Sequence, residues 1–320
     1  MLHDATDIPT IFLRLGYYTM PFMLYLFLLV LIFDIFLLFN LLFKWLPAGF
    51  LKSESFRKKG LLTALIAPGI VVLYGIINFY FIRVSDYRIE IPAKSARLEN
   101  LSVAFISDFH IGDLTSIKFI ERFIAKMKSI NPDIILFGGD LLEGDRDDLK
   151  TLYIESLFRQ LQAQYGIYGV FGNHEHHGGS SSSTFYQNAG IKLLSDTSIL
   201  IENSFYLVGR KDARNRDRLP INDLTKNLSD QIPSILVDHR VTDIKSVIQS
   251  PIDIQLSGHT HHGQLFPFNI ISRKIHDISW GHKKIGNTHF FVTSGIQLWG
   301  PPVRTIGKSE IMLINIKFID

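Results

Sequence analysis

The sequence predicts an α/β domain with two β-sheets, preceded by transmembrane helices. Of the 320 residues, 47% are hydrophobic and only 20% are charged, an average too apolar for one ordinary soluble domain. The excess lies in two long apolar runs at the front, whereas short β-branched runs alternate with helical periodicity from about residue 87 onward. Strands alternating with helices are typical of an α/β domain. We therefore expect a membrane anchor at residues 1–90 and a folded domain at residues 91–320.

The two apolar runs, residues 22–43 and 61–82, are each close to the ~20 residues that a helix needs to cross a hydrocarbon core. Both exceed the ~7 to 15 residues of a signal-peptide core, and no small-residue cleavage pattern follows either run. We predict two retained transmembrane helices. Residues 8–21 are semi-polar and aromatic, so we interpret them as an interfacial segment and keep a further span as the alternative.

The loop between the predicted spans indicates an orientation in the membrane. It holds five basic residues and a single acidic one, Glu54; the basic residues are Lys44, Lys52, Arg57, Lys58 and Lys59. The positive-inside rule places such a loop in the cytoplasm. We therefore expect a multi-pass protein of the cell (inner) membrane, with the lipid bilayer as a partner and the folded domain outside the cytoplasm.

The folded domain shows strands in a regular series. The predicted strands are residues 102–106, 134–137, 167–171, 205–208, 235–237 and 254–256, with further strand at 289–295 and 310–318. Between the first two, Ile117, Ile120, Ile124 and Met127 share one helical face that Asn131 and Pro132 close. Two runs of strands predict a layered sandwich of two sheets.

Charge and cysteine content exclude some functions. Residues 1–90 carry 8 Lys+Arg and 6 Asp+Glu, which leaves 25 and 24 for residues 91–320 and a net charge of +1 there. A near-neutral domain lacks the broad positive field of a protein that binds long nucleic acid. The chain has no cysteine, so disulfides and thiolate metal sites are excluded.

Polar residues of metal-ligand type follow almost every predicted strand. They are Asp108, His110, Asp140, Asn173, His239, His259 and His261, and His174 follows Asn173 directly. Open α/β sheets place their sites at the carboxyl ends of strands. The spacing of Asp108 with His110, and of His259 with His261, puts both side chains of a pair on one side of an extended segment. Glycines at 138, 139, 172 and 258 allow sharp turns and close approach.

This mixture of ligands indicates a class of metal. Imidazole, carboxylate and amide oxygen without thiolate suit Mn, Fe or Zn, and seven such groups are too many for one tetrahedral ion. Two divalent ions that share a carboxylate fit better. Such a pair activates water and stabilises both the attacking and the leaving oxygen of an in-line displacement at phosphorus.

Five ordered blocks carry a family resemblance: Asp108–His110, Gly138–Asp140, Gly172–Glu175, His239 and Gly258–His261. Together they resemble the signature of the calcineurin-like metallophosphoesterase family over roughly residues 98–316. The block GHTHHGQ is most similar to bacterial membrane-associated members. The resemblance implies a four-layer α/β/β/α sandwich and a dinuclear metal centre.

The resemblance also implies a role for each matching residue. Asp108, His110 and His261 would bind the first metal, and Asn173, His239 and His259 the second. Asp140 would bridge the two ions. His174 would be the catalytic proton donor to the leaving oxygen, which suits an imidazole whose pKa lies near neutrality.

We therefore expect a membrane-anchored metal-dependent phosphoesterase that hydrolyses phosphodiester, pyrophosphate or phosphomonoester bonds. Its location favours lipid-linked or cell-envelope substrates. One alternative is a nucleotide phosphodiesterase or nuclease. The other is a membrane sensor that binds metal without turnover, which predicts the loss of a ligand or of His174, and none is lost.

Three neighbouring features have open interpretations. Glu175 is expected to orient a nearby histidine, since metal-bound imidazoles commonly donate to a carboxylate. His262 fits a residue at the rim of the site better than an extra substrate contact. Residues 210–218 alternate basic and acidic groups and fit either an arginine fork for phosphate or a solvated loop.

Overall fold

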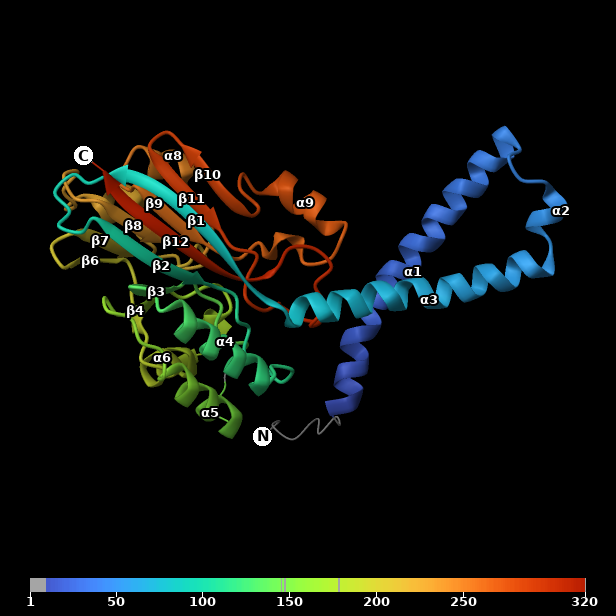
Figure 1. Cartoon of the computed structure of the whole chain (residues 1–320), viewed down its shortest axis with the longest axis horizontal. Helices are drawn as coiled ribbons and strands as arrows, with labels where there is room; N and C mark the ends of the chain where they lie inside the picture. Colours follow the sequence, from blue (N-terminus) through green and yellow to red (C-terminus); the bar gives the residue numbers. More distant parts are fainter. Residues whose placement is uncertain (1–9, 145, 147, 178, 320) are drawn as a thin grey trace. The chain divides into compact units, whose positions relative to one another are not determined.

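The computed structural model describes residues 10–144, 146, 148–177 and 179–319, and divides them into two units. Residues 10–79 and 300–305 form an N-terminal unit. Residues 80–299 and 306–319 form the folded domain. Figure 1 shows both units in the colours of the sequence.

The N-terminal unit consists of α1 (Thr10–Phe43), the short α2 (Ala48–Leu51) and α3 (Glu54–Tyr80). Helices α1 and α3 are long and apolar enough to cross a membrane, with mean hydropathies of 2.8 and 2.2 over their spanning parts. Residues 10–21 continue α1 as helix through Pro21, whereas residues 8 and 9 of the expected interfacial segment lie outside the described residues. Proline removes one backbone donor and crowds the preceding turn, and helices that span membranes tolerate it within their length.

A return segment from the C-terminal part of the chain, residues 300–305, packs within the N-terminal unit. The amide of Arg304 donates to the carbonyl of Gly75 (3.0 Å), and the Asn78 side chain donates to the carbonyl of Arg304 (3.0 Å). A β-carbon at position 75 would overlap Val303, so glycine is required for this close approach.

The folded domain contains two β-sheets, each with six strands in the described part of the chain. The first sheet has the spatial order β1 (Ile82–Pro92), β12 (Ser309–Ile319), β2 (Asn100–Ile106), β3 (Ile134–Phe137), β4 (Ile167–Gly169), β5 (Lys192–Leu193). The second has the order β10 (Gly281–Ile285), β11 (Thr288–Val292), β9 (Ile254–Ser257), β8 (Ser234–Val237), β7 (Phe205–Gly209), β6 (Thr197–Ile201). Strands β2 to β5 are parallel, as are β7, β8, β9 and β11, so their carboxyl ends align.

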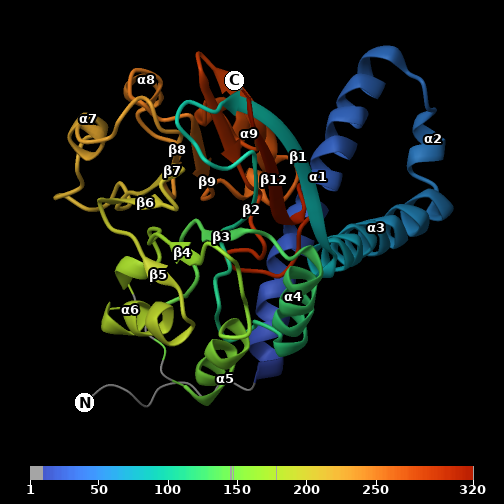
Figure 2. The same cartoon turned by 60° about the vertical axis from the view of Figure 1, so that its left-hand side comes forward.

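Helices cover the outer face of each sheet (Figures 1 and 2). Helices α4 (Ile117–Ile130), α5 (Leu149–Phe158) and α6 (Gly179–Asn188) pack on the first sheet, and α7 (Ile221–Thr225) and α8 (Ile244–Ile248) pack on the second. A third buried cluster, which includes Phe105, Leu136, Leu207 and Leu256, draws its residues from both sheets. The predicted four-layer α/β/β/α sandwich is confirmed.

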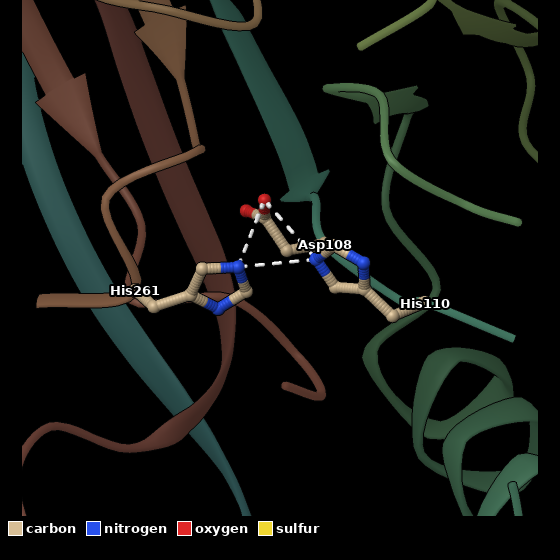
Figure 3. Close-up of side chains that lie close together, drawn as sticks. All are labelled: Asp108, His110 and His261. Atoms are coloured by element: carbon tan, nitrogen blue, oxygen red, sulfur yellow. Dashed lines mark hydrogen bonds and ion pairs between the residues drawn. The ribbon is translucent and has the colours of Figure 1, made fainter. Parts of the chain in front are cut away.

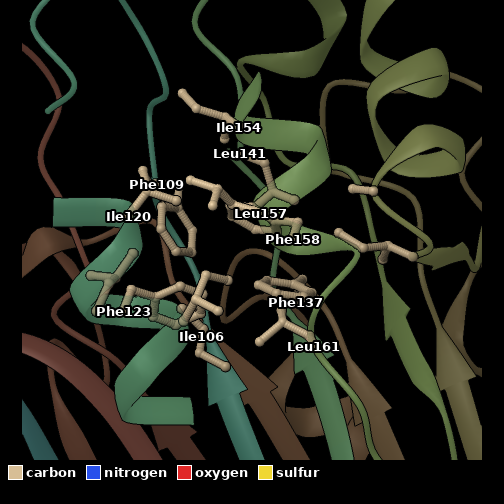
Figure 4. Close-up of a cluster of buried hydrophobic side chains, with 14 of the residues drawn as sticks. Ile106, Phe109, Ile120, Phe123, Phe137, Leu141, Ile154, Leu157, Phe158 and Leu161 are labelled. Atoms are coloured by element: carbon tan, nitrogen blue, oxygen red, sulfur yellow. The ribbon is translucent and has the colours of Figure 1, made fainter. Parts of the chain in front are cut away.

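The core beneath α4 and α5 is rich in aromatic residues (Figure 4). Phe109, Phe123, Phe137 and Phe158 are fully buried, and the rings of Phe109 and Phe123 meet edge to face with centroids 4.8 Å apart. Because Phe109 lies between two predicted ligands, this packing holds the backbone that carries them.

The helix predicted from Ile117 to Met127 is confirmed as α4, which ends at Asn131 in the left-handed conformation. Strand β1 was not predicted, and all but its last two residues fall in residues 1–90, which the sequence assigns to the anchor. Its sequence, IRVSDYRIEIP, alternates polar and apolar residues as an edge strand does. That alternation was the signal that could have identified it.

Candidate metal centre

The seven predicted ligands follow strands of both sheets, and six of them, the Asp and His residues, come together in two groups. Asp108 and His110 follow β2, Asp140 follows β3, and Asn173 follows β4. His239 follows β8 of the second sheet, and His259 and His261 follow β9. The expected placement at strand ends is therefore confirmed, and the site lies across the two sheets of the folded domain.

One group of three ligands comprises Asp108, His110 and His261 (Figure 3). The Nε2 atoms of His110 and His261 are 3.1 Å apart, and Asp108 Oδ1 lies 3.6 Å from His261 Nε2 and 3.9 Å from His110 Nε2. One carboxylate oxygen and two imidazole nitrogens that converge in this way can bind one divalent metal ion.

A second group comprises Asp140, His239 and His259. His239 Nε2 lies 3.1 Å from Asp140 Oδ2, and His239 Nδ1 makes a 2.8 Å hydrogen bond to the carbonyl of Gly138. The carbonyl can only accept, so Nδ1 carries the proton and Nε2 is left as the ligand atom.

Asp140 lies between the two groups. Its Oδ1 accepts a hydrogen bond from the backbone amide of His174 (2.8 Å), whereas its Oδ2 lies 3.1 Å from His239 Nε2 and 4.0 Å from His110 Nε2. One carboxylate thus faces ligands of both groups, which is the arrangement a bridging ligand requires.

One buried atom supports metal binding independently of these distances. Asn173 Oδ1 has no hydrogen-bond partner among the described residues, and Asn173 is 96% buried. An unsatisfied buried acceptor is costly, so this atom fits a position beside a cation. The residues present therefore fit a metal centre made of Asp, Asn and His ligands.

The backbone brings the ligands together differently from the expectation of extended segments. Asp108, His110, Asp140, His259 and His261 all have φ between 47° and 70°. This left-handed conformation is unfavourable for residues with a β-carbon and is concentrated at functional sites. The two side chains of each expected pair, Asp108 with His110 and His259 with His261, do face the site. Sharp backbone turns orient them, however, and not the alternation of an extended strand, so the expectation of extended segments was wrong.

Glycines leave room for the carboxylates. A β-carbon at Gly172 would overlap the carboxylate of Asp140, and one at Gly258 would overlap the side chains of Ser107 and Asp108. Gly139 has φ 93°, and its β-carbon would overlap the backbone of Gly172. The predicted close approach at these glycines is confirmed.

The electrostatics of the site depend on burial and on mutual pairing. Burial raises the pKa of Asp108 against the opposing effect of His239. Burial also acts to raise the pKa of Asp140, but His239 beside it holds that pKa well below its usual range. The pKa of His239 is raised to about 10, since Asp140 outweighs burial, whereas burial lowers the pKa of His259 to about 3. Such strongly perturbed, mutually dependent groups are typical of functional sites.

Glu143 is a site residue that the sequence reasoning missed. Its carboxylate accepts hydrogen bonds from His110 Nδ1 and, at 2.9 Å, from His174 Nδ1. Burial acts to raise the pKa of Glu143, but these two hydrogen bonds hold it at about 2. Its position three residues after Asp140, in the turn that follows β3, was the available signal.

His174 lies beside the ligands without being enclosed among them. Its side chain is 21% exposed, compared with 1% for His110, and its Nε2 is 4.0 Å from Asp140 Oδ2. Burial acts to lower the pKa of His174, but the hydrogen bond to Glu143 and the charge of Asp140 raise it overall. The residue expected to donate a proton thus faces the accessible side of the site.

Replacing Glu143 by glutamine should reduce kcat about 10- to 100-fold, the usual effect of losing a carboxylate that orients metal-site imidazoles. The amide keeps the shape but cannot accept from both Nδ1–H groups as a charged carboxylate does. Steady-state hydrolysis of an aryl phosphodiester measures the effect, with Glu121→Gln on the exposed face of α4 as the matched control. Equal rates for the two variants would show that Glu143 has no role.

Two expectations for neighbouring residues were wrong. Glu175 does not orient a histidine, because its carboxylate accepts from the backbone amides of Asp140 (2.9 Å), Leu141 (2.5 Å) and Gly172 (2.7 Å) and so joins two ligand-bearing turns. His262, which directly follows His261, is not a rim residue, because it is 98% buried and packs on the ring of Trp280. The Glu175 carboxylate is thus bound by backbone amides, and the His262 ring is covered by Trp280 and not by solvent.

The basic run at residues 210–218 is part solvated loop and part buried ion-pair network: residues 213, 214, 216 and 217 are exposed, whereas the other basic residues pair with carboxylates. Arg210 is buried and pairs with Asp238 (3.3 Å) and Asp243 (2.9 Å). Arg218 also pairs with Asp238, and the buried carboxylate of Asp212 pairs with Arg240 (2.9 Å). Buried carboxylates need such partners, so these guanidinium groups compensate the buried charges of Asp212 and Asp238.

The α/β/β/α fold and the converging Asp and His side chains agree with a metal-dependent phosphoric ester hydrolase. Residues 101–263 match the family model described as calcineurin-like phosphoesterase, and the chain belongs to this family. The sequence resemblance to that family is confirmed.

Curated relatives agree with this assignment. The chain is 29% identical over 263 residues to an uncharacterized metallophosphoesterase of Campylobacter jejuni (79% of this chain, 69% of the relative). It is 30% identical over 235 residues to one of Helicobacter pylori (71% and 63%). It is also 28% identical over 283 residues to a transmembrane protein with metallophosphoesterase domain of Danio rerio (83% and 64%). The chain thus spans less than two thirds of the length of the Helicobacter pylori and Danio rerio relatives. The two apolar helices of the chain, together with its similarity to a transmembrane protein, indicate membrane association.

Proposed function

We propose that the protein is a membrane-anchored phosphoesterase with a dinuclear centre of Mn, Fe or Zn ions. The observation that carries this proposal is the pair of ligand groups beside Asp140, whose Oδ2 lies 3.1 Å from His239 Nε2 and 4.0 Å from His110 Nε2. Asp108, His110 and His261 would hold one ion, Asn173, His239 and His259 the other, and Asp140 would bridge them. When bound, two such ions supply Lewis acidity and an activated water for displacement at phosphorus.

The chain's own residues have separate tasks in this reaction. Glu143 accepts the Nδ1 protons of His110 and His174, so it orients both rings with Nε2 toward the site. His174, which is part-exposed and has a raised pKa, donates its Nε2 proton to the leaving oxygen. Glu175 holds the turns of Asp140 and Gly172 in place through backbone amides.

The membrane anchor suggests the class of substrate. A phosphoesterase domain held close to a bilayer meets lipid headgroups and lipid-linked envelope precursors at high local concentration. We therefore propose phosphodiester, pyrophosphate or phosphomonoester bonds of such molecules as substrates. A nucleotide phosphodiesterase is the rival within the same reaction class.

The detergent-solubilised full chain tests this function. Metal analysis combined with hydrolysis of aryl phosphodiesters, aryl phosphomonoesters, phospholipids of varied headgroup and nucleotides should reveal turnover, with preference for lipid phosphoesters. His174→Ala is the control for contaminating hydrolases. A chain with both metal positions occupied and no turnover on any of these compounds would support the metal-binding sensor instead.

We also propose that the folded domain lies outside the cytoplasm. The basic loop at residues 44–59 supports this orientation through the positive-inside rule. A reporter that is active only in the cytoplasm, fused after Asp320, should be silent, whereas the same reporter inserted between Ser53 and Glu54 should be active. The opposite pattern would reverse the proposed orientation.

A further inference from the structure

Helix α9 (Phe268–Ile275) has its amphipathic faces reversed relative to a normal helix on a soluble domain. Its two buried residues are polar, Asn269 and Ser272. Its apolar residues face outward: Phe268 is 43% exposed, Ile271 53% and Ile275 69%. A surface helix normally buries its apolar stripe.

The exposed apolar residues form one continuous stretch of the chain with a basic end. We define the α9 surface as Phe266, Phe268, Ile270, Ile271, Arg273, Lys274 and Ile275, all of which are exposed. Arg273 and Lys274 form no ion pair among the described residues. An apolar face with adjacent unpaired cations complements a layer that is apolar inside and anionic at its surface.

Helix α4 provides a comparison within the same domain. It also has a strongly amphipathic sequence, but its apolar residues Phe119, Ile120, Phe123, Ile124 and Met127 are at least 97% buried in the core. The exposure at α9 is therefore a property of this helix and not of the domain's helices in general. Figure 1 shows α9 set apart from α8, which covers the second sheet.

Helix α9 is joined firmly to the turn that carries two proposed metal ligands. Ser279 connects them, because its carbonyl accepts from Thr260 Oγ1 (2.6 Å) and its hydroxyl bonds to His262 Nδ1 (3.1 Å) and to Ser272 Oγ of α9 (2.8 Å). Thr260 lies between His259 and His261. In addition, a β-carbon at Gly263 would overlap the backbone of Asn269, so the turn and the helix are in close contact. Whatever holds α9 therefore also positions this side of the metal centre.

We propose that the α9 surface lies in the headgroup region of the bilayer that anchors the chain, as a second membrane contact made by the folded domain itself. The chain carries apolar helices long enough to span that bilayer, so a lipid surface is within reach of the domain without any further partner. Five large apolar side chains enter the headgroup–acyl boundary, and Arg273 and Lys274 contact lipid phosphates. This contact holds the turn of His259 and His261 close to the phosphate layer, which favours substrates whose phosphorus lies at the bilayer surface.

The absence of cysteine makes a direct depth measurement possible in the full chain. Ile271→Cys and Ile275→Cys, each labelled with the fluorophore bimane, are reconstituted in vesicles of phosphatidylcholine and phosphatidylglycerol. Ala125→Cys on the exposed face of α4 is the matched control. Quenching by lipids with a doxyl group on the acyl chain is compared with quenching by aqueous iodide.

Doxyl quenching at positions 271 and 275 should exceed that at position 125 by about threefold or more, with iodide quenching reduced in the opposite order. Doxyl quenching no greater than at position 125, with full access to iodide, would show an α9 surface in water and overturn the proposal. Labels shielded from both quenchers would show that a protein surface covers α9, and would overturn it equally. All three substituted side chains are exposed, so unchanged melting temperatures confirm the fold.

This inference does not depend on hydrolysis. The quenching readout uses no turnover, so an inactive protein whose α9 labels are quenched by doxyl lipids would refute the proposed function alone. An active protein whose α9 labels remain in water would refute only the membrane contact.

Discussion

Replacing Asp140 by asparagine should abolish most of the activity and release at least one metal ion. The Oδ2 atom of Asp140 faces both ligand groups, 3.1 Å from His239 Nε2 and 4.0 Å from His110 Nε2. Asparagine keeps the acceptor for the His174 amide but removes the negative charge that the two ions would share. We expect kcat/KM to fall by more than about 100-fold, beyond the roughly 10- to 100-fold effect of changing residues that only support ligands.

Metal content and hydrolysis of an aryl phosphodiester are measured on the same preparation of this variant. Asp230→Asn is the control, because Asp230 is exposed and remote from the ligands in sequence. An Asp140→Asn variant that retains its metal and its rate would exclude the bridging role, and with it the arrangement of two groups around one carboxylate.

Replacing His174 by alanine should lower kcat by about 10²- to 10⁴-fold, the usual contribution of a positioned proton donor. The metal content should remain, because the proposed ligand set does not include His174. His176→Ala is the matched control, since His176 is an exposed histidine of the same turn. Loss of metal together with activity would make His174 a ligand rather than a proton donor.

The same residue determines the expected pH dependence. The pKa of His174 is raised, because its hydrogen bond to Glu143 and the charge of Asp140 outweigh burial. The donor is therefore the imidazolium, which is present below this pKa and is lost as the pH rises through it. In the wild-type chain kcat should fall on this alkaline limb, and His174→Ala should lack that limb. A limb that persists in the variant would assign it to another group.

The predicted site was largely accessible from the sequence because its residues follow strands. Asp108, Asp140, His239 and His261 each follow a run of buried β-branched or apolar residues, and the strands that they follow are parallel within each sheet, so the ligands of one sheet lie at one edge of it. The role of Glu143 could not be predicted in this way, because it depends on two histidines from different turns. The contacts of Glu175 with backbone amides could not be predicted either, because they also join separate turns of the chain.

The fold was predictable where local periodicity was strong. The long apolar runs, the face of α4, the all-apolar strand β3 and the apolar residues 235–237 of β8 were all evident in the sequence. Strand β1 was not, because an edge strand with alternating polar residues resembles a linker when its partner, β12, lies more than 200 residues later. Pairing over such a separation leaves no local trace.

The sequence by itself determined which residue types follow the strands, how many ligands the site can offer, and that two helices are apolar enough to span a membrane. These are properties of short segments, so the chemistry of the residues in each segment is enough to predict them. Only the tertiary structure decided that Asp140 faces ligands of both sheets, that Glu143 holds two imidazoles, and that α9 turns its isoleucines outward. The physical reason is that each of these depends on contacts between residues far apart in the chain, where packing and backbone turns, rather than local pattern, choose the partner.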